Sequence, residues 1–362
     1  MSPFIYNALP ARVIFGHGTI AQVADELRLL GSKRALVLAS SPQIGDAKRL
    51  ADSLGDLCAG LFAGAAMHTP IEVTEQVMVM VRDLGVDCTV ALGGGSATGL
   101  GKAIALRTDL PQIVVPTTYA GSEATPILGE TAAGQKTTQR TLKVLPEVII
   151  YDVDLTLTLP AALTATSGMN AIAHAVEALY ARDANPVISL LAEQGIAKLA
   201  QSLPVIMRDP QNRQARSDAL YGAWACGTCL GAVGMSLHHK LCHVLGGSFD
   251  LPHAPTHTVI LPYATAYNAV AAPEAMSRIA DALGVTDAAQ GLFDLARSLG
   301  APTSLQEIGM PESGLDRAAD IAVANPYWNP RPVERAAIRA LLQAAYVGLS
   351  PKDVSALEAN YA

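Results

Sequence analysis

Histidines are concentrated in one stretch of this chain, where they could hold a metal ion or move protons. Six of the eight lie between residues 170 and 257: His174, His238, His239, His243, His253 and His257. Hydrophobic residues make up 50% of the sequence and charged residues only 16%, so a solvated surface does not account for this density. Imidazole is a common metal ligand and the side chain best suited to proton transfer near neutral pH.

Two pairs of these polar side chains have helical spacing. Asn170 and His174 lie in an apolar-periodic segment that predicts a helix, and His239 and His243 repeat the four-residue interval. Residues four apart share one helical face, so each pair is expected to point in one direction. Gly246–Gly247 is expected to end the second helix.

A fifth side chain, His253, stands between two prolines. Pro252 and Pro255 argue against a helix interior, so His253 is expected to lie in a loop. Two helical pairs and a loop imidazole can converge on one pocket, as metal sites and proton-transfer sites both require. For any one of these histidines, a hydrogen-bonded role in the core is the alternative.

Composition limits the class of protein. With 362 residues the chain is long enough for two domains, and its net charge of −7, with no basic run, argues against nucleic acid as a partner. No apolar stretch approaches the length of a membrane span and no leader pattern is found, so a cytoplasmic protein is expected. Five cysteines at irregular spacing do not form a disulfide framework, and Cys226 and Cys229 are expected to be small buried residues.

Two halves of the chain differ in pattern. Up to about residue 155, β-branched runs alternate with amphipathic helical segments, which favours an α/β domain with a parallel sheet. From residue 156 to 362, alanine-rich helical periodicity replaces the strands and predicts an all-α domain. The predicted strands are 12–15, 35–38, 88–92, 112–115 and 147–151.

A glycine triplet connects one predicted strand to a helix. Gly93, Gly94 and Gly95, followed by Ser96, would let the backbone approach a pyrophosphate at the helix N-terminus. A P-loop is excluded, because Ser96 stands where that motif requires glycine and Lys102 is followed by alanine.

Two other loops have features of cofactor sites. The segment 16–21 matches a dinucleotide fingerprint, but the next strand ends in Ser40 and Ser41 with no acid for a ribose hydroxyl, so this glycine-rich segment is interpreted as a structural turn. Thr117, Thr118 and Ser122 follow another strand at the edge where parallel sheets bind ligands, with helix capping as the alternative.

The order of these motifs resembles the iron-containing alcohol dehydrogenase family over nearly the whole chain. The resemblance rests on Gly93–Ser96 with Lys102, on Pro116–Thr118 with 121–123, on 168–177, on the 239–246 segment and on Asn329–Arg331. It implies a dehydroquinate synthase-like architecture, with a Rossmann-like α/β domain for a nicotinamide cofactor (1–155) and a helical catalytic domain (156–362). It also implies a metal site of one aspartate and three histidines.

Carried over position by position, that ligand set falls on Asn170, His174, His239 and His253, and His243 matches a histidine near the nicotinamide. Asn170 replaces the family's aspartate, and Gly99 replaces an aspartate usual in the glycine loop. These departures resemble the maleylacetate reductase branch. That branch implies NADH- or NADPH-dependent reduction of maleylacetate, a small dicarboxylate, to 3-oxoadipate in bacterial catabolism of aromatic compounds, by a homodimer.

Replacing the only anionic ligand weakens hard metal binding, so a metal-free site is expected, although three histidines can bind zinc. His243 and His253 are then expected to donate a proton and to stabilise the enolate, with His174, His239 and Asn170 completing the site. The rival interpretations are a metal-dependent alcohol or polyol dehydrogenase of the same fold and a non-catalytic nucleotide-binding protein.

Overall fold

A computed structural model describes residues 4–9, 11–132 and 135–354. The chain divides into two compact units, one formed by Ala8–Leu159 and the other by the residues from Pro160 onward together with the described residues before Ala8. The division falls a few residues after the boundary expected from the sequence. The separate roles expected for the two units remain predictions.

The first unit is built on a six-stranded sheet in the order β1-β8-β5-β4-β2-β3, and every pairing in it is parallel. The expected parallel α/β architecture is therefore confirmed. The strands are β1 (Arg12–Gly16), β2 (Ala35–Leu38), β3 (Cys58–Phe62), β4 (Cys88–Gly93), β5 (Gln112–Pro116) and β8 (Val148–Asp152). A separate antiparallel hairpin is formed by β6 (Ile127–Ala132) and β7 (Gln135–Arg140).

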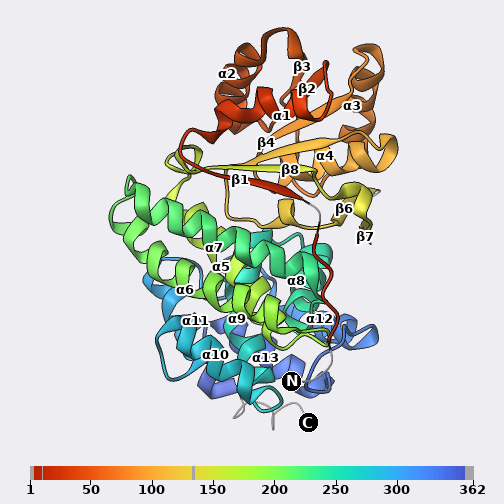
Figure 1. Cartoon of the computed structure of the whole chain (residues 1–362). Coiled ribbons are helices and arrows are strands. Elements are labelled where there is room, and N and C mark those ends of the chain that lie inside the picture. Colours follow the sequence, from red (N-terminus) through yellow and green to blue (C-terminus); the bar gives the residue numbers. More distant parts are fainter. Residues whose placement is uncertain (1–3, 10, 133–134, 355–362) are drawn as a thin grey trace. The chain divides into compact units, whose positions relative to one another are not determined.

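Helices cover both faces of this sheet. Alternate residues of a strand point to opposite faces, so Val37 packs in one hydrophobic cluster, while Leu36 and Leu38 pack in the other. Helices α1 (Val23–Leu29) and α2 (Ile44–Leu54) contribute to the first cluster, and α3 (Ile71–Asp83) and α4 (Gly95–Thr108) contribute to the second (Figure 1). Burial on both faces explains why the strands read as continuous apolar runs.

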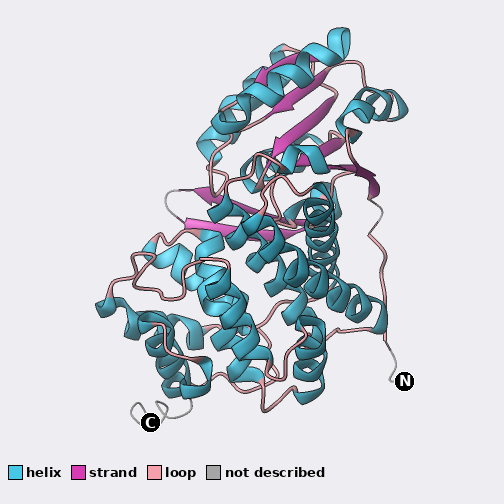
Figure 2. Ribbon diagram, turned by 90° about the vertical axis from the view of Figure 1, so that its left-hand side faces the viewer, coloured by secondary structure: helices cyan, strands magenta, loops and turns pink. Residues whose placement is uncertain are grey.

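The second unit contains no strand among its described residues (Figure 2). Its helices are α5 (Ala161–Leu179), α6 (Pro186–Arg208), α7 (Arg213–Ala232), α8 (Leu237–Phe249), α9 (His253–Asn268), α10 (Pro273–Leu283), α11 (Ala288–Ser298), α12 (Leu315–Ala324) and α13 (Arg335–Val347). The expected all-α character is confirmed. Cys226 and Cys229 are buried within α7, as the sequence suggested.

Two predicted helix boundaries are wrong. Helix α8 continues through Gly246–Gly247 to Phe249 and ends at Asp250, which adopts the left-handed conformation. His253 is not in a loop, because it begins α9. Pro255 lies in the first turn of that helix, where a backbone N–H has no intrahelical partner and proline is tolerated.

Within the described residues, no single helix is both long and apolar enough to cross a membrane. Helices α7 and α8 reach that composition only as a pair, with a bend of 94° between them.

Candidate active site

Helix α5 carries three polar side chains on one buried face. Asn170, His174 and Glu177 are three or four residues apart, so they follow one side of the helix. The Asn170 Nδ2 atom lies 3.4 Å from His174 Nε2, and His174 Nδ1 lies 2.9 Å from His239 Nε2 on α8. Two helices thus bring together Asn170, His174 and His239, as expected, and we call these three residues the buried row.

The carboxylate of Glu177 continues this row on the far side of His239. Its Oε2 atom lies 2.7 Å from His239 Nδ1 and accepts a 2.7 Å hydrogen bond from the backbone N–H of Ser236. Its Oε1 atom accepts a bond of the same length from the N–H of His238. A buried carboxylate thus occupies the N-terminus of α8, where free N–H groups and the helix dipole stabilise negative charge.

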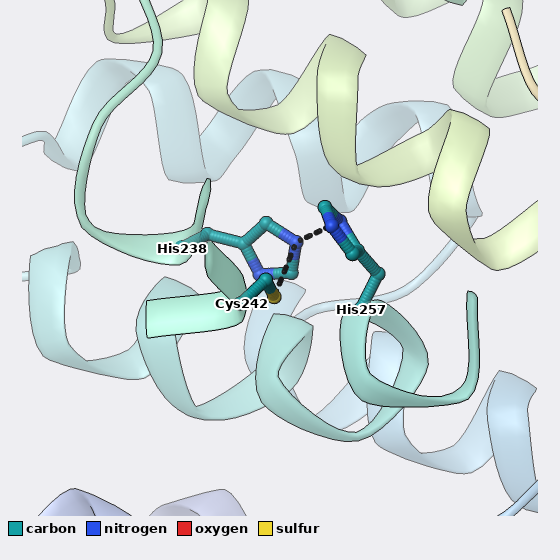
Figure 3. A group of neighbouring side chains, drawn as sticks. All are labelled: His238, Cys242 and His257. Carbon is teal, nitrogen blue, oxygen red and sulfur yellow. Dashed lines mark hydrogen bonds between the residues drawn. The ribbon is translucent and has the colours of Figure 1, made fainter. Parts of the chain in front are cut away.

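A second group of side chains, His238, Cys242 and His257, lies between α8 and α9 (Figure 3). His238 Nε2 is 3.0 Å from His257 Nδ1 and 3.7 Å from Cys242 Sγ. The His257 ring lies close to the rings of His253 and His239, with centroids 4.3 and 5.0 Å apart. We call His238, Cys242 and His257 the inner group. Through His257, this group contacts histidines expected to act in catalysis.

Burial keeps this inner group uncharged. Desolvation, reinforced by the neighbouring imidazoles, lowers the pKa of His238 and that of His257 well below the usual value for histidine. Burial, together with the charge of Glu177, raises the pKa of the Cys242 thiol well above its usual range. Neutral imidazoles and a neutral thiol are therefore packed beside the site.

The two histidines expected to touch the reacting atoms are more accessible. His253 is exposed at the start of α9, and His243 is half-buried on α8 one turn after His239. His243 Nδ1 lies 2.9 Å from the hydroxyl of Tyr327, and its ring centroid is 6.2 Å from that of His239. Both side chains thus border the buried histidines, as a site open to a small molecule requires.

Three further motif residues have structural contacts. Asn329 accepts hydrogen bonds from the N–H of Leu237 and from Asn268, and so supports the start of α8. The Arg331 guanidinium lies 4.1 Å from the centre of the Tyr267 ring, and the Lys240 ammonium lies 5.6 Å from the centre of the Tyr327 ring.

The metal ligand set implied by the family comprises Asn170, His174, His239 and His253. His239 Nδ1 is directed to Glu177, as the outer nitrogen of a ligating histidine often is directed to a carboxylate, and His239 Nε2 lies 2.9 Å from His174 Nδ1. Among the described residues, the three His, Cys, Asp or Glu side chains whose donor atoms lie within 4.8 Å of one another are His238, Cys242 and His257, not the family's set. The donor atoms of His174, His239 and His253 therefore do not all lie within that distance of one another in this arrangement.

The inner group is also a poor metal site. Binding through His238 Nε2 and His257 Nδ1 would put a proton on each of the remaining ring nitrogens. Those two nitrogens, His238 Nδ1 and His257 Nε2, are buried without a hydrogen-bond partner among the described residues. A ligating histidine normally donates its second N–H to an acceptor, so the group fits hydrogen bonding better than coordination.

The residues expected to hold a cofactor meet at adjacent strand ends in the first unit. Gly93 ends β4 and pairs with Pro116 of β5, and its carbonyl accepts from the N–H of Thr117. The α4 helix then begins with Gly95 and Ser96, has no side chain capping its N-terminus and has open space where a Gly95 side chain would lie. A Cβ at Gly94 would come within 2.9 Å of Thr118, which explains the need for glycine beside that loop.

Buried hydroxyls in the same region fit a ligand. Thr117 Oγ1 and Ser122 Oγ have no hydrogen-bond partner among the described residues. An uncapped helix N-terminus with hydroxyls nearby is suited to the phosphates of a dinucleotide. Ser40 follows β2 and donates its hydroxyl hydrogen to Gln43.

Lys102 and the glycine segment at 16–21 have structural roles rather than contacts suited to a cofactor phosphate. Lys102 is buried, and its ammonium nitrogen lies 2.6 to 3.0 Å from oxygens of Ser122, Thr125 and Ile127, so it holds the loop after β5 rather than a phosphate. The N–H groups of Gly18 and Ile20 bond to the carboxylate of Asp152. That contact fits the interpretation of the first glycine segment as a turn.

Sequence reasoning omitted Glu177, His238, Cys242, His257 and Tyr327 from the site. Spacing contained a signal for most of them, because Glu177 is three residues after His174, Cys242 is four after His238, and His257 is four after His253. Tyr327 had no such signal, since it approaches His243 from a distant, non-helical segment.

Comparison with known proteins assigns the class. The family model for iron-containing alcohol dehydrogenase matches residues 10–153, and the model for the C-terminal domain of the Fe-containing alcohol dehydrogenase family matches residues 164–346. The chain belongs to the iron-containing alcohol dehydrogenase family and is an oxidoreductase.

Individual relatives within the family are similar to this chain over nearly its whole length. The maleylacetate reductase of Rhizobium sp. (strain MTP-10005) is 58% identical over 352 residues, which cover 97% of this chain and 100% of the relative. The crystal structure of maleylacetate reductase from Agrobacterium tumefaciens has 58% identity and a TM-score of 0.94, covering 97% of this chain and all of that one. An iron-containing alcohol dehydrogenase from Corynebacterium glutamicum has 42% identity and a TM-score of 0.93, covering 98% and 99% of the two chains.

Proposed function

We propose that this oxidoreductase is a maleylacetate reductase, which uses NADH or NADPH to reduce maleylacetate to 3-oxoadipate in the bacterial catabolism of aromatic compounds. The observation that carries the proposal is its full-length likeness to maleylacetate reductases at 58% identity. The substitution of the family's aspartate by Asn170 in the same buried row as His174 and His239 agrees with it.

A bound nicotinamide cofactor would supply a hydride to the alkene carbon that is β to the ketone. The ketone oxygen then gains negative charge, and the α carbon must take a proton to complete the reduction. Stabilising that oxygen and supplying that proton are the tasks left to the protein. The two accessible imidazoles, His243 and His253, are suited to these roles because they border the buried row and remain open to a ligand.

The buried row favours a dianionic substrate. Asn170 is neutral and can donate a hydrogen bond, whereas an aspartate at this position would place a second negative charge in the same site as Glu177. Like charges in a buried site repel, so a carboxylate here would oppose the binding of a dicarboxylate. The amide therefore suits maleylacetate better than the family's usual residue does.

We further propose that the reductase works without a metal ion, because Asn170 supplies no negative charge and the donor nitrogens of the three carried-over histidines do not all lie within 4.8 Å of one another. Protein treated with EDTA and then freed of chelator is expected to retain its turnover of maleylacetate. Metal content measured on the same sample confirms removal. Loss of turnover that zinc or iron restores would show that the metal-free mechanism is wrong.

The substrate class is tested by following the oxidation of NADH with maleylacetate and, separately, with a panel of aldehydes. Oxidation with maleylacetate supports the proposal. A preference for an aldehyde, or for the reverse reaction with an alcohol or polyol, would instead identify a metal-dependent alcohol dehydrogenase of the same fold, a class to which the Corynebacterium glutamicum relative belongs by name. A homodimer in the cytoplasm, with no membrane or nucleic acid partner, remains our proposal for its state in the cell.

A further inference from the structure

Glu177 is the one residue in this region whose carboxylate bonds at once to a site histidine and to the N-terminus of the helix that carries it, within the described part of the chain. Its side chain is fully buried, and both of its oxygens are used. A negative charge in such a place is costly unless it is compensated. Two backbone N–H groups and the His239 ring provide the compensation.

The contacts of Glu177 fix the proton on His239. Both backbone partners are obligatory donors, so the carboxylate accepts at each oxygen. The remaining contact, 2.7 Å to His239 Nδ1, is then a hydrogen bond in which Nδ1–H donates. A neutral histidine has only one N–H, which leaves His239 Nε2 with a lone pair.

The same logic orders the rest of the row. His239 Nε2 must accept from the nitrogen 2.9 Å away, so His174 carries its proton on Nδ1. His174 Nε2 then has the lone pair that faces the amide nitrogen of Asn170 at 3.4 Å. Every donor in the row therefore points from Asn170 through the two imidazoles to the carboxylate.

We propose that Glu177 is a positioning residue, which holds His239 in the Nδ1–H form and thereby sets the direction of hydrogen bonding along the row of Asn170, His174 and His239. It does not touch the substrate and acts through His239. This inference rests on the proposed function for its effect on turnover, but not for its effect on the His239 tautomer.

Glu177→Gln removes the charge and retains nearly the same shape. The glutamine amide has an NH2 group in place of one carboxylate oxygen, so one side of the group donates where the carboxylate accepted. The Nδ1–H form of His239 is then no longer enforced. We expect kcat with maleylacetate to fall between about 10- and 100-fold, as is common for residues that orient a functional histidine. The KM for NADH is expected to stay within about twofold, because the phosphate loop belongs to the other unit.

Asp152→Asn is the matched control. Asp152 is also a buried carboxylate that accepts only from backbone N–H groups, those of Gly18, Ile20 and Asp154, among the contacts of the described residues, and it contacts no histidine of the site. The control should lower the melting temperature comparably and leave kcat nearly unchanged. An equal loss of kcat in both variants would reduce the role of Glu177 to stability and overturn the proposal.

The tautomer is read directly by NMR of protein labelled with ¹⁵N in its histidines, with the His239 signals identified from a His239→Gln sample. The proposal requires Nδ1 protonated and Nε2 unprotonated in the unaltered enzyme. A proton on Nε2 would overturn it even if Glu177→Gln failed to fold. Glu177→Asp keeps the carboxylate and should restore part of the lost kcat, whereas a wild-type chain inactive on maleylacetate but with the expected tautomer would contradict the proposed function alone.

Discussion

Side chains in this site differ in access to a ligand, and that difference separates their roles. Asn170, His174 and His239 are buried and bonded to one another, whereas His243 and His253 are the accessible imidazoles at the border of the group. Residues that exchange a proton with a substrate must be reachable, while residues that orient them need not be. Replacing the accessible pair should therefore affect chemistry more than folding.

His243→Ala and His253→Ala are each expected to lower kcat by at least about a hundredfold, within the range for the loss of a general acid or of an oxyanion donor. Affinity for NADH should be retained, because the glycine loop that begins α4 contains neither residue. The measurements are kcat, NADH affinity and melting temperature for each variant. Near-normal turnover in a less stable protein would show that these histidines serve packing instead.

Part of the site was predictable at the level of the residue. Four-residue spacing indicated the pairs Asn170 with His174 and His239 with His243, because a helix places such residues on one face whatever the rest of the fold. The contact of His174 with His239 was not predictable in the same way, since it depends on how α5 packs against α8. The contacts of Glu177 with Ser236 and His239 were not predictable either, since these residues lie some sixty positions further along the chain.

At the level of the element, the buried strands were the easiest to predict. The five predicted runs match β1, β2, β4, β5 and β8 to within one residue at each end. Strand β3 was missed because Cys58–Phe62 contains no β-branched residue, and β7 was missed because its sequence is polar throughout. The start of α9 was misjudged because proline in a first helical turn looks, in sequence, like a loop.

Helix α4 explains one departure from the family's glycine loop. A Cβ at Gly99 would lie 2.3 Å from Thr69 Oγ1, and both Thr69 and the preceding His68 have positive φ angles of 47° and 64°. The buried side chain of Thr69, in the loop before α3, therefore occupies the space that an aspartate at position 99 would need. Gly99 and this loop form one packing unit.

Gly99→Ala is expected to lower the free energy of unfolding by about 1–3 kcal/mol, the usual cost of overpacking. Combining it with Thr69→Gly should recover much of that loss, because the obstructing hydroxyl is removed and glycine accepts a positive φ. Urea unfolding of the two single variants and the double variant measures the coupling. Strict additivity of the three values would contradict the contact.

The end of β2 bears on the choice between cofactors. Ser40 and Ser41 follow this strand, where an acid would reject a 2′-phosphate, so usable activity with NADPH as well as NADH is expected. The comparison is kcat/KM for the two cofactors at a saturating concentration of maleylacetate. A preference for NADH above roughly a thousandfold, or ~4 kcal/mol, would require a group that excludes the phosphate by other means.

For the molecule as a whole, the buried histidines make stability depend on pH. His238 and His257 have pKa values well below that of an exposed histidine, chiefly through burial. From about one pH unit above 6.5 upward, both are largely neutral in the folded and in the unfolded chain. Below that pH the unfolded chain takes up protons that the folded chain does not, so stability falls as the pH falls.

Between pH 6.5 and 5, each of these two residues is expected to contribute a slope of up to about 1.4 kcal/mol per pH unit to the free energy of unfolding. His257→Asn should make the slope shallower by one such contribution, measured as urea midpoints across this range. His17→Asn, a change at an exposed histidine in the other unit, should leave the slope in place. Equal slopes in all three proteins would contradict the assignment.

The pairing of β1 with β8 has a consequence for the chain during its synthesis. Arg12 is aligned with Val148, so β1 leaves the ribosome well before β8, its neighbour in the described sheet. At roughly 5–20 residues per second, β8 follows β1 by on the order of ten seconds. Throughout that interval, the nascent chain exposes an unpaired apolar strand, which is open to chaperone binding and to misassociation.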